Sequence, residues 1–75
     1  VQIMNIPYVN LGNAIILRAV EDYREALGTL RYSPHDKDAV ISKDEIERFF
    51  RSGWFGLLTS IDPEMLMNRL RKEVA

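Results

Sequence analysis

The only histidine of this chain, His35, lies in the segment SPHDKD beside Asp36 and Asp38. Histidine can serve as a general base or a metal ligand near neutral pH. Catalytic triads also need a nucleophile and an orienting acid, and structural metal sites need several ligands. One histidine and no cysteine exclude thiolate and multi-histidine metal sites, so a catalytic or metal-binding role for His35 would depend on Asp36 and Asp38. We interpret His35 as a polar residue at a solvated helix start and expect no metal and no cofactor.

A second group with chemical potential is the acidic cluster Asp44, Glu45 and Glu47. Paired carboxyl groups support acid–base catalysis when their surroundings separate their pKa values. These three fall in the first turn of an expected helix, where acidic residues favour the helix dipole without any catalytic role. Glycine-rich phosphate loops and calcium-loop spacings are absent from the sequence. We therefore expect no catalytic residues and no enzymatic activity.

The strongest functional signal is a cluster of aromatic and basic residues: Arg48, Phe49, Phe50, Arg51, Trp54 and Phe55. Such residues dominate protein interfaces, and they also stack on nucleic-acid bases. In a small domain, however, large apolar side chains are usually buried. We expect the phenylalanines, Leu57 and Leu58 to form core, and the arginines and Trp54 to form an exposed edge.

Met65 and Met67 are two residues apart on the last expected helix, so they cannot both face the core. We place Met65 on the inner face with Leu66, Leu70 and Val74, and Met67 on the surface. The candidate interaction surface is then Arg48, Arg51, Trp54 and Met67.

The helices that carry these residues are predicted to begin at four start signals: Asn13, Ser33, Ser42 and Asp62. The longest helix is expected over residues 13–30, because one set of apolar residues recurs at helical spacing: Ile16, Ala19, Val20, Tyr23, Ala26, Leu27 and Leu30. Residues 34–41 are expected to form a short helix or an ordered loop.

A capping box at Ser42 and Glu45 predicts a helix over residues 43–51, which Ser52 and a left-handed Gly53 would end. Residues 54–61 predict a further helical turn or two. Asp62 and Pro63 predict the start of the last helix. The fold class is therefore all-α: a small helical bundle of three main helices plus one or two short helical turns, with an extended N-terminal arm.

We divide the chain into an extended arm or tail at residues 1–12 and a single helical domain at 13–75. The 75 residues contain no cysteine, and a core of this size supplies only about 3–5 kcal/mol. Oligomerisation is the remaining way to stabilise so small a domain, and we expect a homodimer.

No apolar run approaches the roughly 20 residues that span a bilayer, and no signal peptide is visible. We expect a cytoplasmic protein with no membrane partner.

The segment AVEDYREAL, followed after a polar linker by EIERFFRSGWFGLLTSIDPEMLMNRLRKE, resembles small uncharacterised proteins of prophages and integrative elements of low-GC Gram-positive bacteria. The likeness covers about residues 14–74, and FFRSGWFGLLTSID is its most specific part. It implies a cytoplasmic protein expressed from a mobile element and carries over no catalytic residue.

We expect a non-enzymatic interaction protein that self-associates and binds a host or phage protein. The alternative is a small nucleic-acid-binding accessory protein in which Arg69, Arg71 and Lys72 contact phosphates. Dedicated nucleic-acid binders usually carry a basic excess, whereas this chain has a net charge of −1. The charge balance therefore favours the first interpretation.

Overall fold

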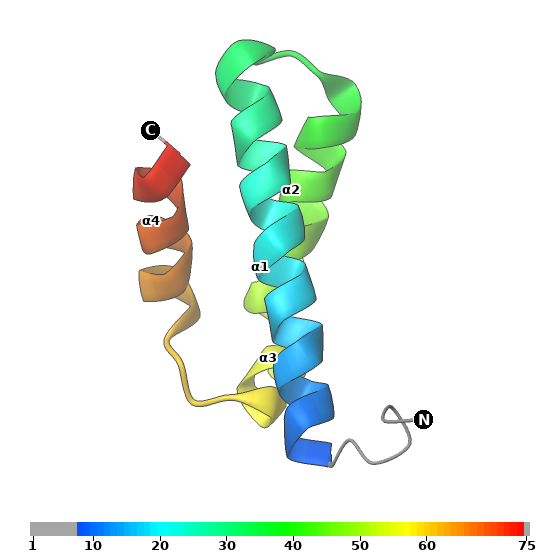
Figure 1. Ribbon diagram of the computed structural model, residues 1–75, viewed down its shortest axis with the longest axis vertical. Helices are drawn as coiled ribbons and strands as arrows, with labels where there is room; N and C mark the ends of the chain where they lie inside the picture. The colour runs from blue at the N-terminus through cyan, green and yellow to red at the C-terminus, as the bar shows by residue number, and fades with distance from the viewer. Residues whose placement is uncertain (1–7, 75) are drawn as a thin grey trace.

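The computed structural model describes residues 8–74 and contains four helices in that range (Figure 1). They are α1 (Tyr8–Tyr32), α2 (Lys37–Phe50), α3 (Gly53–Leu58) and α4 (Pro63–Val74). No strand occurs among these residues. The prediction of a small all-α bundle, with three main helices and one short one, is confirmed.

The first helix begins earlier than predicted, at Tyr8 instead of Asn13. The prediction of an extended arm is therefore wrong for residues 8–12, and residues 1–7 lie outside the described residues. Proline is common at the first turn of a helix, and Pro7 immediately precedes α1. Gly12 is buried at the contact with α3, and a Cβ atom there would lie 3.4 Å from Leu58. The added first turns of α1 thus bring Gly12 into close packing with α3.

One continuous helix, α2, replaces the short segment and the separate helix that the sequence predicted. Its N-cap is Asp36, whose carboxylate accepts a hydrogen bond of 2.9 Å from the backbone of Ala39. Neither Ser33 nor Ser42 is the cap, and Ser42 lies exposed inside α2. No glycine or proline interrupts residues 37–50, so a helix that starts at Asp36 has no reason to stop at Ser42.

The junction between α2 and α3 turns without left-handed backbone. Gly53 is the first residue of α3, and no described residue has a positive φ, so the predicted left-handed cap is wrong. Ser52 is the N-cap of α3, and its hydroxyl accepts from the Phe55 backbone. Farther along, Asp62 caps α4 as predicted, because its carboxylate accepts a hydrogen bond of 2.9 Å from the Glu64 backbone.

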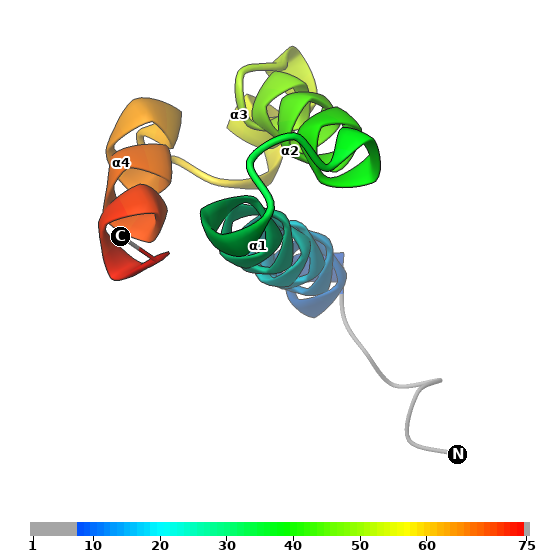
Figure 2. The same ribbon diagram turned by 90° about the horizontal axis from the view of Figure 1, so that it is seen from above.

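Helix α1 lies between α2 and α4, and α3 covers its lower end in Figure 1; Figure 2 shows the same order from above. The main core cluster lies where the four helices meet, and among the described residues it contains six buried side chains: Ile16, Tyr23, Phe50, Phe55, Met67 and Leu70. Phe50 is central. Its ring meets those of Tyr23 and Phe55 edge to face, at centroid distances of 5.6 and 5.4 Å. Such aromatic pairs add packing energy to their buried area.

Three predictions about which residues are buried are wrong. Met67 is fully buried, whereas Met65 is 56% exposed. Leu57, expected in the core, is 80% exposed. Packing against the other helices decides which face of α3 and α4 is buried. Met67 and Leu70 face the bundle on α4, and Phe55 and Leu58 face it on α3. Leu57, between Phe55 and Leu58, and Met65, two residues before Met67, then point away from the core.

Candidate interaction surface

The most exposed apolar side chains of the bundle's lower end belong to α3. Trp54 is 71% exposed and Leu57 is 80% exposed. They are three residues apart on one helix, so they share one side of it. Phe55 is buried and Leu58 packs against the core, which fixes the inward face of α3. We call Trp54 and Leu57 the α3 surface.

Two more exposed apolar residues follow α3 along the chain. Ile61 is 47% exposed in the connector between α3 and α4, and Met65 is exposed in the first turns of α4. Sequence reasoning missed Leu57, Ile61 and Met65. Leu57 could have been found, because a helical turn that buries positions 55 and 58 exposes positions 54 and 57.

The predicted edge of Arg48, Arg51, Trp54 and Met67 does not form one surface. Trp54 and Arg48 are exposed, on α3 and α2, while Met67 lies in the core. Arg51 is half exposed but engaged: its guanidinium donates to both carboxylate oxygens of Glu64, at 2.7 and 3.3 Å. That hydrogen bond lowers the pKa of Glu64. Arg51 therefore fixes the start of α4 against the end of α2.

The structure also brings together a polar cluster that the sequence analysis did not single out. The Tyr23 hydroxyl on α1 donates to Glu47 on α2 at 2.7 Å. Arg71 on α4 donates to the same carboxylate at 3.0 Å and to the Tyr23 oxygen at 3.2 Å. Lys43 and Arg51 add ion pairs with Glu47 at 3.7 Å each. Glu47 thus joins three helices, and its side chain is only 12% exposed.

These contacts shift the ionisation of the cluster. Burial and then the hydrogen bond to Glu47 raise the pKa of Tyr23 to about 12. Burial alone would raise the pKa of Glu47, but the hydrogen bonds from Tyr23 and Arg71 and the charge of Lys43 together lower it. The cluster keeps the tyrosine neutral and the glutamate charged. Such fixed protonation states suit a structural role in holding three helices together. Arg71 is occupied there, so it is not a free phosphate contact.

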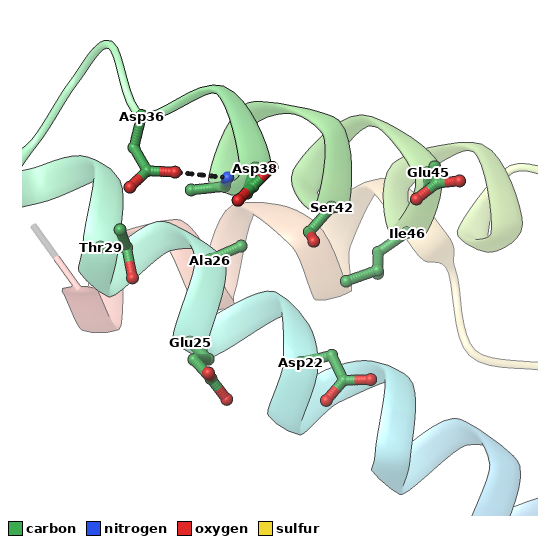
Figure 3. A pocket seen from close by; sticks show the side chains of 10 residues that line it. Asp22, Glu25, Ala26, Thr29, Asp36, Asp38, Ser42, Glu45 and Ile46 are labelled. Atoms are coloured by element: carbon green, nitrogen blue, oxygen red, sulfur yellow. Dashed lines mark hydrogen bonds between the residues drawn. The ribbon is translucent and has the colours of Figure 1, made fainter.

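A groove of about 460 Å³ runs between α1 and α2 (Figure 3). Its lining contains five acidic residues and no basic one: Asp22, Glu25, Asp36, Asp38 and Glu45. Asp36 is used as the cap of α2, and Asp22 is paired with Arg18. Within residues 8–74, no three histidine or acidic side chains converge in a way that could hold a metal ion. The groove gives this side of the bundle a negative character.

Comparisons with known proteins found no family model, no curated relative and no solved structure that matches this chain. The resemblance to mobile-element proteins therefore stays a prediction. Among the helices that the structure describes, none is both long enough and apolar enough to cross a membrane.

Proposed function

We propose that the protein is a non-enzymatic interaction domain that self-associates through the α3 surface and binds a host or phage protein. Its setting, in this proposal, is the cytoplasm of a bacterium that carries the mobile element. The exposure of Trp54 and Leu57 is the observation that carries the proposal.

The α3 surface suits a protein partner for two reasons. Tryptophan is among the residues most enriched in interface hot spots, and an exposed indole can bury a large area at little cost in conformational entropy. Keeping Trp54 exposed also brings this short helix no folding benefit, since Phe55 and Leu58 already anchor α3. Leaving so much apolar surface in water is unfavourable unless a partner removes it.

A second copy of the chain is the partner that the size of the domain favours. Only eight hydrophobic residues in the described part of the chain are buried. A small core without disulfides gains stability when association buries more apolar surface. We propose a homodimer as the basic unit, with the host or phage protein bound to it.

Sedimentation equilibrium of the native chain and of Trp54→Ala/Leu57→Ala tests the proposal. The native chain is expected to shift from monomer to dimer mass as concentration rises, and the variant to stay monomeric. Leu17→Ala/Ile41→Ala is the matched control, because it removes two exposed apolar side chains from α1 and α2. Both variants keep helix-favouring residues, so their helicity should be unchanged by circular dichroism. A native chain that is monomeric at every concentration would rule out self-association.

A further inference from the structure

Helix α4 is attached to the rest of the bundle differently from the other helices. It contributes two buried side chains, Met67 and Leu70. Leu66 also packs against the core. Arginines attach the helix at four further places: Arg24 to Glu73 at 3.0 Å, Arg31 to the Val74 carbonyl at 2.7 Å, Arg51 to Glu64 at 2.7 Å, and Arg71 to Glu47 at 3.0 Å. Charged contacts of this kind, mostly exposed, are weak individually and are screened by salt.

The connector between α3 and α4 makes no hydrogen bond to α1 or α2 among those that the structure gives its residues. It spans residues 59–62, and Thr59 has extended backbone at φ −157° and ψ 160°. The hydrogen bonds that the structure gives these four residues are all local: Thr59 to Phe55, Ile61 to Thr59, and Asp62 to the first turn of α4. A short connector without hydrogen bonds to the rest of the bundle permits exchange of a terminal helix between copies.

The seat of α4 recognises the helix by features that any copy of the chain carries. Arg24, Arg31 and Arg51 line it, and they bind two glutamates and a terminal carbonyl of α4. Met67 and Leu70 fill its apolar part, as in the binding of an amphipathic helix to a groove. None of these contacts requires α4 to belong to the same chain.

We propose that two copies of this chain dimerise by exchanging α4, each placing its own helix in the seat of the other. The connectors of an exchanged pair must pass close to each other. Trp54 and Leu57 precede the connector and Ile61 lies within it, so these exposed apolar side chains would meet their counterparts at the crossing. The exchange therefore supplies a cover for the α3 surface. It rests on the self-association part of the proposed function.

Two complementary variants test the exchange. One chain carries R24E and R51E in the seat, and the other carries E64R and E73R on α4. Each chain alone opposes like charges whether α4 docks on its own bundle or on an identical copy. In a mixed exchanged dimer, both seats meet a helix of opposite charge. The two chains are unfolded and refolded together, and native mass spectrometry separates the dimers by mass.

The matched control pair is R48E/R69E with E21R/E45R. It has the same charge changes, at exposed residues for which the described part of the chain shows no ion pair. It therefore measures the general attraction between oppositely charged chains. A chain with all four changes, R24E/R51E/E64R/E73R, restores the pairs internally and checks that the seat tolerates the reversal.

The exchange predicts that the mixed dimer is enriched over the two homodimers about tenfold more in the complementary pair than in the control pair. Equal enrichment of the mixed dimer in both pairs would overturn the exchange and leave self-association through the α3 surface intact. The absence of dimers from every sample, the native chain included, would overturn the exchange together with self-association.

Discussion

Among single residues, Glu47 links the helices most directly. It lies on α2, and its carboxylate accepts hydrogen bonds from Tyr23 on α1 and Arg71 on α4. A charge of this kind, largely shielded from water, is stable only while its partners stay in place. The cluster around it leaves no buried side-chain polar atom unsatisfied among the described residues. Its role is to fix the relative positions of three helices.

Replacing Glu47 with alanine should lower the free energy of unfolding by about 1–3 kcal/mol, since the Tyr23 hydroxyl and Arg71 lose their acceptor. Glu47→Gln keeps an acceptor oxygen for Tyr23 and should cost less. Chemical denaturation measures both, and Glu45→Ala serves as the control, since Glu45 is an exposed acid on the same helix for which the described residues show no ion pair. Equal stability of Glu47→Ala and the control would show that the cluster contributes nothing.

The lowered pKa of Glu47 sets the direction of an acid effect. The folded state binds the proton less readily than the unfolded state, so the contribution to stability is complete above the unfolded pKa. It is lost as the pH falls from about 5 through the lower folded pKa. Thermal unfolding should therefore show a steeper fall in stability below pH 5 for the native chain than for Glu47→Gln. Parallel curves would contradict this account.

At the scale of helices, α2, α3 and α4 each begin after one capping side chain, and packing decides which face of a helix is buried. Asp62 was predictable, because aspartate before proline and glutamate is a strong start signal that nothing else overrides. The caps at Ser33 and Ser42 were wrong because Asp36 offers a carboxylate to Ala39 and an uninterrupted helix follows. Helix propensity and local sequence signals do not show which of several candidate caps will begin the helix.

Asp36→Ala should destabilise the protein by about 0.5–2 kcal/mol, since the first turn of α2 loses its acceptor. Ser42→Ala should be neutral or slightly stabilising, because serine is a poorer helix former than alanine in an exposed helix interior. Urea denaturation of the two single variants makes the comparison. A larger loss of stability for Ser42→Ala than for Asp36→Ala would show that Ser42 caps a helix after all.

The methionines of α4 give the second test at this scale. Met67→Ala removes a fully buried side chain and should cost about 2–5 kcal/mol, enough to unfold much of a small domain. Met67→Leu preserves most of the volume and should cost less than about 1.5 kcal/mol. Met65→Ala should change stability by no more than about 0.5 kcal/mol. A reversed order would mean that α4 docks through its other face.

The sequence predicted the helical class, the last helix start and the burial of Phe50 and Phe55, because these follow from periodicity and strong local signals. It could not decide between Met65 and Met67, since both spacings give an apolar stripe with Leu66 and Leu70. It also could not find Glu47 as a partner of Tyr23 and Arg71, which are 24 residues away on either side. Such contacts exist only once helix packing is known.

At the scale of the whole molecule, the bundle has different chemistry on different sides. The α1–α2 side carries the acidic groove, the α1–α4 side is joined by arginine contacts, and the lower end presents the α3 surface. Trp54, Leu57 and Ile61 are exposed in α3 and the connector that leads to α4, and other exposed apolar residues lie on α1, α2 and α4. Both the proposed self-association and the proposed exchange of α4 bury this end.

Fluorescence emission of Trp54 over a dilution series tests self-association through α3 most directly, because Trp54 is the only tryptophan of the chain. The indole is 71% exposed in the monomer, so emission at the lowest concentrations should be that of a solvated tryptophan. We predict a blue shift as concentration rises, over the range in which the mass doubles, since association removes the indole from water. An emission maximum that stays at the solvated position while the protein dimerises, or in a protein that never dimerises, would contradict the account.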